Sequence, residues 1–380
     1  MSLPPLSLYI HVPWCVRKCP YCDFNSHAAP EQLPEDAYVQ ALLDDLDIEL
    51  SLIQGRPLQS IFIGGGTPSL FSAQAIGQIL QGVAARIPFA DDIEITLEAN
   101  PGTFELARFE GFRNAGVNRL SIGVQSFNAE HLQRLGRIHN PVEALAAARA
   151  AVEIFPRVNL DLMHGLPEQT PAEAMDDLQQ ALEINPGHLS WYQLTIEPNT
   201  EFHARPPSLP LDEALWDIQE QGQALLEKTG YRQYEISAYA RPGQQARHNL
   251  NYWQFGDYIG IGAGAHGKIS RFDATGQLQI QRRHKQRQPK AYLDPARRLA
   301  GNEPIALEDR PFEFMLNALR LSEGVSSDLF KTRTGVSLSS VETLLQQARQ
   351  RELLINDTTR LAPTPLGRLF LNDLLSLFLN

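Results

Sequence analysis

The cysteines of this 380-residue chain all lie in one short segment near the N-terminus. Cys15, Cys19 and Cys22 follow the spacing C-x3-C-x2-C, and the sequence contains no other cysteine. Three thiolates at this spacing can bind three irons of a four-iron cluster, which leaves the fourth iron without a protein ligand. An open iron, like the open position of a catalytic zinc, is a place where a small molecule can bind and react.

Two other interpretations of the cysteines stay open from the residues alone. The first is a three-cysteine zinc site, although zinc sites commonly have a second C-x2-C pair downstream and this chain has none. The second is chance clustering of buried thiols. Disulfides are disfavoured because thiols stay reduced in the cytosol, where we expect this protein to be.

The segment around the cysteines resembles the signature of the radical S-adenosylmethionine (SAM) superfamily. Residues 9–26 read YIHVPWCVRKCPYCDFNS, and an apolar run at 8–12 predicts a strand just before the cysteines. In that superfamily SAM fills the open iron through its amine and carboxylate, and its reductive cleavage gives a 5′-deoxyadenosyl radical. The wider string resembles the branch of the oxygen-independent coproporphyrinogen III oxidases and their relatives, the HemW heme chaperones. This likeness runs along nearly the whole chain.

Apolar, β-rich runs alternate with helix-like segments through the first part of the chain. The predicted strands are 8–12, 60–63, 93–98, 119–124, 157–163 and 189–196, and the predicted helices are 34–53, 73–86, 104–115, 140–154, 171–184 and 212–229. Such alternation predicts parallel βαβ units with right-handed crossovers. Six units give an open, partial barrel, and the resemblance implies the same (β/α)6 core.

A glycine run follows the second predicted strand, at residues 64–68 (GGGTP). Glycines at this place let the polar atoms of a ligand approach the backbone closely, although a plain tight turn would use them equally well. The resemblance implies that this segment holds the amino group of SAM, through Gly65, Gly66 and Thr67.

Polar side chains stand at the ends of the other predicted strands, where the catalytic groups of such barrels gather. Glu98, Gln125 and Asp161 could each hydrogen-bond an amine, a ribose or an adenine there, or could cap the following loops. The resemblance assigns SAM contacts to these three residues and also to Tyr9 and Arg137. From the residues alone, Arg137 could equally be a surface side chain.

A second motif, H-N-x-x-Y-W, begins at His248 and places a histidine beside two aromatic residues. It could present an imidazole as an axial iron ligand with flat side chains against a porphyrin, or be an ordinary half-buried segment. It resembles the segment that the HemW branch associates with heme, so the resemblance implies His248 as the heme ligand. Glycines at 260–264 fit close packing against a cofactor, but no βαβ unit follows to make them a dinucleotide motif.

One dense basic run, RRHKQR at 282–287 with Lys290 after it, interrupts an otherwise acidic chain. It could be a solvated loop, or it could bind heme propionates, an acidic partner or an anionic membrane surface. From residue 307 onward the pattern predicts three helices, a two-stranded wing (353–361 with 363–367) and a closing apolar helix at 366–379. The expected recognition helix, 339–351, carries only Arg349 and Arg351 as cations, so we interpret this part as a lid or docking domain.

The sequence therefore predicts an α/β protein with three parts. These are a radical SAM partial barrel at 1–235, a connecting segment with the heme motif and the basic run at 236–304, and a small winged-helix-like α+β domain at 305–380. A net charge of −11 argues against broad binding to nucleic acid. No apolar run reaches the ~20 residues that span a bilayer, and the N-terminus lacks a basic-then-apolar signal. We expect a cytoplasmic protein, with peripheral contact at the inner face of the membrane left open.

Within the resembled branch, two features favour the heme chaperone over the oxidase. Phe24 stands two positions after the third cysteine, where the oxidases have a further cysteine, and the chain begins eight residues before Tyr9, whereas the oxidases extend further. We therefore predict a chaperone that binds heme and a SAM-ligated [4Fe-4S] cluster. It would receive electrons from a reducing donor and pass heme to an acceptor hemoprotein, such as a membrane-bound respiratory subunit. The alternative is radical oxidative decarboxylation of coproporphyrinogen III. A DNA-binding iron sensor, a third interpretation, is disfavoured by the charge.

Overall fold

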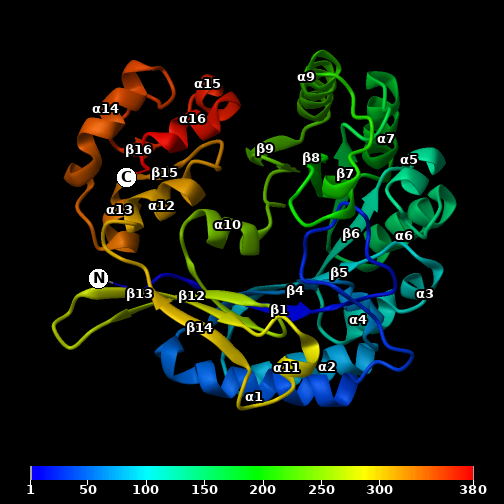
Figure 1. Ribbon diagram of the computed structural model, residues 1–380, viewed down its shortest axis with the longest axis horizontal. Helices are drawn as coiled ribbons and strands as arrows, with labels where there is room; N and C mark the ends of the chain where they lie inside the picture. Colours follow the sequence, from blue (N-terminus) through cyan, green and yellow to red (C-terminus); the bar gives the residue numbers. More distant parts are fainter. Residues whose placement is uncertain (1, 380) are drawn as a thin grey trace.

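The computed structural model describes residues 2–379, apart from the side chain of Phe104. Its centre is one twelve-stranded sheet in the order β14-β13-β12-β11-β1-β4-β5-β6-β7-β8-β10-β9 (Figure 1). The six predicted strands lie side by side and parallel in the middle of the sheet. They are β1 (Leu6–Val12), β4 (Leu58–Gly65), β5 (Phe89–Ala99), β6 (Arg119–Gln125), β7 (Arg157–His164) and β8 (His188–Gln193).

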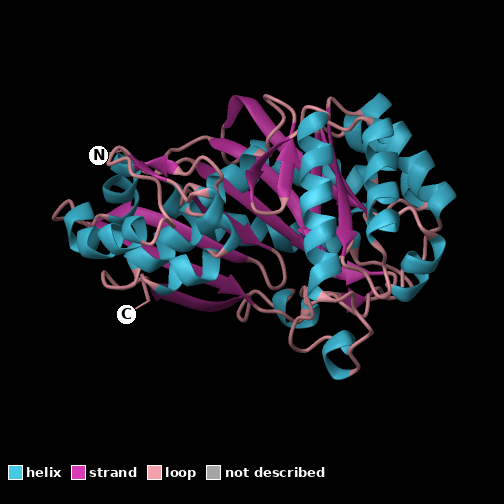
Figure 2. Cartoon of the chain, turned by 90° about the horizontal axis from the view of Figure 1, so that it is seen from above, coloured by secondary structure: helices cyan, strands magenta, loops and turns pink. Residues whose placement is uncertain are grey.

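Helices cover the outer face of these strands, as the labelled helices along the lower and right sides of Figure 1 show, and Figure 2 gives the same helices and strands seen from above. They are α1 (Glu35–Ile53), α2 (Ala73–Ala84), α4 (Phe109–Asn114), α6 (Pro141–Ile154), α7 (Pro171–Ile184) and α9 (Asp212–Lys228), with the shorter α3 (Thr103–Leu106), α5 (Ala129–Arg134) and α8 (Glu201–Ala204) in the connections. The helix predicted at 104–115 is thus divided into α3 and α4. Residues Asn140 and Thr170 begin α6 and α7 with capping boxes, each followed by proline in the first turn.

Side chains alternate between the two faces of the parallel strands. Leu97, Leu120 and Leu160 point outward and pack with the helices into one large apolar core. The residues between them point inward and are mostly polar, Glu98 and Asp161 among them. A closed barrel fills its interior with branched apolar side chains. The polar inner face of this sheet is therefore a surface for solvent or ligand, which agrees with an open barrel.

The segment predicted as a connection adds strands to both edges of the same sheet. One edge gains β9 (Arg232–Glu235) and β10 (Ala238–Ala240). The other gains β11 (Asp257–Ile261), which runs parallel to β1, and then β12 (His266–Phe272), β13 (Leu278–Lys285) and β14 (Leu299–Pro304) as antiparallel neighbours. Between these two groups, α10 (Arg247–Trp253) crosses the inner face, as Figure 1 shows.

The basic run lies largely on β13, so its interpretation as a solvated loop is wrong. Lys285 is buried, and its Nζ lies 2.6 Å from Asp45 Oδ1 and 2.7 Å from Glu49 Oε1 of α1. Arg283 pairs with the same Glu49 at 2.9 Å. Cations buried at a sheet surface need such partners, because an unpaired buried charge is strongly destabilising. Arg283 and Lys285 therefore fasten the edge of the sheet to α1.

A second apolar core lies between the β12–β13 hairpin and the C-terminal helices. Those elements are α12 (Arg310–Ala318), α13 (Ser327–Thr334), α14 (Glu342–Gln350), α15 (Pro365–Leu369) and α16 (Leu371–Ser376). The predicted wing is misplaced: the two-stranded piece pairs β15 (Val325–Ser326) with β16 (Arg360–Leu361), and Leu354 and Pro363 form only an isolated bridge. The three-part domain division stays a prediction. Within residues 2–379, no helix is long and apolar enough to cross a membrane.

Candidate cofactor and ligand site

The cysteines lie in the loop that follows β1. This loop is framed by a short parallel pair, β2 (Trp14–Cys15) with β3 (His27–Ala28), and the N–H of Cys22 donates to the carbonyl of Cys19 at 3.1 Å. Cys15 is buried, Cys19 and Cys22 are half-buried, and all three are free thiols. Their side chains line one cavity of about 450 Å³ at the carboxyl ends of the strands.

All the predicted SAM contacts except Tyr9 line this same cavity, which we call the cysteine cavity. They come from β4 and the turn after it, from β5, β6 and β7, and from the loop after α5, and they are Gly65, Gly66, Thr67, Glu98, Gln125, Arg137 and Asp161. Tyr9 lies in an adjoining cavity, where its hydroxyl is 2.9 Å from Nδ1 of His11. The fold thus brings together residues as far apart in the sequence as Cys15 and Asp161. The contact of the seven residues with SAM stays a prediction.

The glycines after β4 are required by the cysteine loop that passes over them. A Cβ on Gly66 would lie 2.5 Å from the carbonyl oxygen of Trp14, and Gly65 has φ +119°, a conformation that favours glycine. In this position the Gly66 N–H donates to the carbonyl of Val12 at 2.7 Å, and the Gly65 N–H donates to Oε2 of Glu98 at 3.0 Å. The glycine run therefore serves close backbone packing and also sets one carboxylate at the cavity wall.

Two carboxyl groups face the cysteine cavity from neighbouring parts of the sheet. Burial, together with the negative charge of Asp161, raises the pKa of Glu98 to about 8. Burial also raises the pKa of Asp161, although its carboxylate accepts from Ser121 at 3.1 Å and Asn159 at 2.8 Å. Within the described part of the chain, neither carboxyl forms an ion pair with a Lys, Arg or His side chain. Such uncompensated groups in a cavity are typical of a site that receives a donor-rich ligand.

Arg137 stands between these carboxyls and the thiols. Its Nη2 donates to Asn100 Oδ1 at 2.8 Å and to the carbonyl of Gly123 at 2.7 Å, and its Nη1 lies 3.6 Å from Sγ of Cys19. The buried Nε of Arg137 has no hydrogen-bond partner in the described part of the chain. Nearby, Gln125 has φ +69°, an uncommon conformation for a residue with a side chain. A buried donor without a partner and a strained residue both indicate a binding site.

The donor set fits an iron–sulfur cluster better than a single ion. Burial raises the thiol pKa of Cys15 and Cys22, so the thiolates need a nearby positive charge, which a cluster would provide together with Arg137. No three His, Cys, Asp or Glu side chains among residues 2–379 converge on one metal ion. A cluster does not require this convergence, because each cysteine binds a different iron.

A larger cavity of about 720 Å³, which we call the aromatic cavity, adjoins the first. The two share Asp23, Phe24, Gly65 and Glu98 as lining residues. Its other walls are aromatic and cationic, and they include Tyr252, Trp253, Phe255, Tyr258, His266, Arg282 and Arg287. The predicted heme motif therefore contributes its Tyr and Trp, both at the end of α10, to this cavity.

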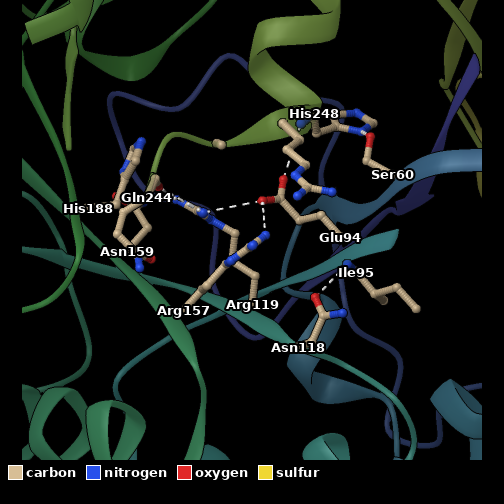
Figure 3. A network of polar contacts seen from close by, with 12 residues as sticks. Ser60, Glu94, Ile95, Asn118, Arg119, Arg157, Asn159, His188, Gln244 and His248 are labelled. Atoms are coloured by element: carbon tan, nitrogen blue, oxygen red, sulfur yellow. Dashed lines mark hydrogen bonds and ion pairs between the residues drawn. The ribbon is translucent and has the colours of Figure 1, made fainter. Parts of the chain in front are cut away.

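His248 lies one helical turn before Tyr252 and lines neither cavity. It is 1% exposed, and both ring nitrogens are hydrogen-bonded: Nδ1 with Ser60 Oγ at 2.9 Å and Nε2 with Tyr252 Oη at 2.9 Å. Burial lowers its pKa to about 3. Figure 3 shows His248 beside Ser60 at the edge of a polar network. Its role as heme ligand stays a prediction, and it requires that one of these two bonds be given up.

The same network neutralises a buried carboxylate. Glu94 Oε1 accepts from the backbone N–H of His248 at 3.2 Å, and Oε2 lies 3.3 Å from Arg119 and 3.4 Å from Arg157 (Figure 3). Arg119 also donates to the carbonyl of Gln244, at the approach to α10. These bonds hold α10 against the inner face of the sheet.

Two polar residues that hydrogen-bond predicted SAM contacts also line the cysteine cavity, although the prediction did not include them. Tyr192 of β8 donates its hydroxyl to Oε1 of Gln125 at 3.1 Å, and Asn100, just after β5, donates to Oγ1 of Thr67 at 3.2 Å. Both follow the rule that identified Glu98, since each stands where a parallel strand ends. The position of each residue at the end of a predicted strand was the sequence signal that could have identified it.

Comparison with known proteins gives matches along the whole chain. The family model of the radical SAM superfamily matches residues 9–181, and that of the HemN C-terminal domain matches residues 305–370. The heme chaperone HemW of Escherichia coli strain K12 is 55% identical over 100% of this chain and 99% of its own length. The heme chaperone HemW of Haemophilus influenzae is also 55% identical over 100% of this chain and 99% of its own.

Among solved structures, coproporphyrinogen III oxidase (HemN) from Escherichia coli matches with a TM-score of 0.82 and 25% identity. This match covers 99% of the chain described here and 90% of the oxidase. The predicted fold class, a radical SAM barrel followed by a small C-terminal domain, is therefore confirmed.

Proposed function

This chain belongs to the HemW family of the radical SAM superfamily, and from this premise we propose that it is a heme chaperone. It would bind heme and a SAM-ligated [4Fe-4S] cluster and would transfer heme to an acceptor hemoprotein. The observation that carries the proposal is the 55% identity to heme chaperones over the full length of both chains. Membership of the superfamily implies the cluster and SAM. The binding of heme by this chain is the part of the proposal that the titration below tests.

Each part of the cysteine cavity has a task in this proposal. Cys15, Cys19 and Cys22 hold the cluster, and Arg137 offsets the negative charge of the thiolates. Bound cluster and SAM supply one-electron chemistry. The remaining predicted residues position SAM: the backbone at Gly65 and Gly66 approaches it closely, and Glu98 and Asp161 accept hydrogen bonds from its amine or ribose.

The aromatic cavity is the proposed place of the heme. Its volume of about 720 Å³ lies within the range of about 300–1,000 Å³ that is usual for ligand sites. Rings of Tyr252, Trp253 and Tyr258 offer faces for a porphyrin, and arginine forks suit carboxylates such as propionates. Phe24, which replaces the further cysteine of the oxidases, lines both cavities. Heme bound here would therefore lie directly beside the cluster and SAM.

The acceptor, the electron donor and the cellular location are also parts of the proposal. We infer a cytoplasmic chaperone that reaches a membrane-bound respiratory acceptor by peripheral contact. No nucleic-acid partner is proposed, because the net charge is −11.

The proposal is tested by an anaerobic titration of the full-length, cluster-loaded protein with hemin, followed at the Soret band. We expect saturation at one heme per chain. His203→Ala is the matched control, because this exposed histidine lines neither cavity, and it should leave the titration unchanged. A signal that rises without saturation in both proteins would refute the chaperone and favour the oxidase alternative.

A further inference from the structure

The aromatic cavity contains a histidine that the heme motif does not include. An axial ligand needs a ring nitrogen with a free lone pair and a cavity wide enough for the porphyrin beside it. Two histidines line the aromatic cavity, His11 and His266. Both ring nitrogens of His11 are already hydrogen-bonded, Nδ1 with the Tyr9 hydroxyl at 2.9 Å and Nε2 with the carbonyl of Asn25 at 2.8 Å. Both ring nitrogens of His248 are also hydrogen-bonded, and His248 lies outside the cavity.

His266 differs from both in that its ring makes no hydrogen bond to any described residue. It begins β12 opposite His284 of β13, and the two rings stack with their centroids 5.5 Å apart and their planes at 20°. His284 in turn packs over Gly301, where a Cβ would lie only 2.1 Å from its ring. His266 is exposed and lines the aromatic cavity. Burial lowers its pKa, as do the neighbouring His284 and Arg282, so the ring is neutral and keeps its lone pair at neutral pH.

A cation without a carboxylate partner stands near the same cavity wall. Arg282 is ion-paired with Glu313, and Lys268 with Asp257 at 2.9 Å. Arg287, in contrast, forms no ion pair with a described carboxylate. Its guanidinium Nε donates only a long hydrogen bond to Asn25 Oδ1, at 3.5 Å, while its backbone carbonyl accepts from the side chains of Asn25 at 2.9 Å and His27 at 3.1 Å. Its guanidinium is exposed and lines the cavity. A heme propionate would provide the carboxylate that Arg287 lacks.

We propose that His266 ligates the heme iron and that Arg287 binds a heme propionate. The ligand is thereby placed on β12, whereas Tyr252 and Trp253 of the heme motif form the part of the cavity wall that α10 contributes. His248 then supports the wall from behind, through its bond to the Tyr252 hydroxyl. This inference rests on the proposed heme-chaperone function and deepens it.

The test compares hemin titrations of the full-length, cluster-loaded protein in the wild type, His266→Ala, His248→Ala and the control His203→Ala. The Soret band gives the affinity, and the electron paramagnetic resonance spectrum of the ferric heme reports an axial imidazole. Loss of an outer partner of a metal ligand already costs about 10–100-fold in affinity, so we expect His266→Ala to lose at least about tenfold. It should also lose the imidazole signature, which His248→Ala should retain.

The reverse result, with the signature lost in His248→Ala and retained in His266→Ala, overturns the proposal while the chaperone function stands. If both variants lose it, millimolar imidazole is added to His266→Gly and His248→Gly. A signature restored in His266→Gly supports the proposal, and failure to restore it there overturns the proposal. If the wild type itself does not saturate, the proposed function fails as well, and the two failures are thereby distinguished.

The propionate contact is tested with heme dimethyl ester, which lacks free carboxylates. Arg287→Ala should bind heme several-fold more weakly than the wild type and should bind the ester equally well. Lys290→Ala, at an exposed cation that does not line the cavity, is the matched control. Equal heme affinity in the wild type and Arg287→Ala would remove Arg287 from the site.

Discussion

Glu98 offers a direct test of the electrostatics of the cysteine cavity, through the variant Glu98→Gln. Burial and the charge of Asp161 raise its pKa from 4.5 to about 8 in the folded protein. Between these two values the folded chain keeps a proton that the unfolded chain has lost. Folding therefore takes up a proton in this window, and the stability of the wild type must fall as the pH rises from about 4.5 to about 8.

The size of the effect follows from the two pKa values. At about 1.4 kcal/mol per pH unit, the full difference corresponds to roughly 5 kcal/mol. The Glu98 side chain is only partly buried and faces a cavity that water can enter, so we expect about 2–4 kcal/mol. This is a large part of the 5–15 kcal/mol by which domains are usually stable. Glutamine has nearly the same shape and cannot ionise, so Glu98→Gln should lack this loss.

The assay is urea unfolding of the full-length, cluster-free protein under anaerobic reducing conditions, at several pH values from 5.0 to 8.5. We expect the free energy of unfolding of Glu98→Gln to exceed that of the wild type by a margin that grows with pH and levels off above about 8. A second variant, Asp161→Asn, should reduce the pH dependence of the wild type, because it removes the second cause of the raised pKa. Parallel profiles for the wild type and Glu98→Gln would refute the reasoning.

The cluster and the reaction are tested by two further experiments. Replacement of any one cysteine by alanine should abolish the broad brown absorbance of the reconstituted protein. The far-ultraviolet circular dichroism spectrum should not change, because the motif lies outside the helices and the twelve-stranded sheet. A variant with full iron content would contradict the assignment of Cys15, Cys19 or Cys22. The reduced, cluster-loaded protein with SAM should not convert coproporphyrinogen III, because Phe24 replaces the further cysteine of the oxidases; vinyl products above a cluster-free control, measured by chromatography, would contradict this.

The central strands could be predicted because their pattern is local. Each has an apolar face that packs on the helices, as Leu120 and Ile122 do in β6, and the strand predicted at 119–124 is observed as Arg119–Gln125. The edges of the sheet could not be predicted in this way. β11 pairs with β1 across some 250 residues, and no local pattern identifies the partner of a strand.

The basic run shows that the surroundings of a side chain are equally hard to predict from the local sequence. A cluster of cations is usually solvated, and only the fold reveals that the carboxylates of Asp45 and Glu49 surround Lys285, from positions 240 and 236 residues earlier. The predicted heme motif lies at the aromatic cavity, and its role in heme binding stays a prediction. Its spacing could not indicate that Tyr252 faces the cavity while His248 lies behind it, bonded at both nitrogens.

The inward-pointing side chains of the sheet form two layers, one around Glu94 and one around Glu98, and the two layers differ in their charge balance. Glu94 and Glu98 lie on the same strand and point inward from positions four residues apart. Glu94 is neutralised by Arg119 and Arg157, and His248 closes that layer with its backbone N–H. Among residues 2–379, no cation pairs with Glu98 in this way, and its neighbour Asp161 adds a second negative charge. A ligand that carries amines, a metal ion or positive charge is therefore complementary to the layer that contains Glu98 and not to the layer that contains Glu94. The imidazole of His248 belongs to the layer of Glu94, and both of its ring nitrogens are hydrogen-bonded, so it is a poor source of a free lone pair for iron. His266 lines the aromatic cavity together with Glu98 and retains a free lone pair.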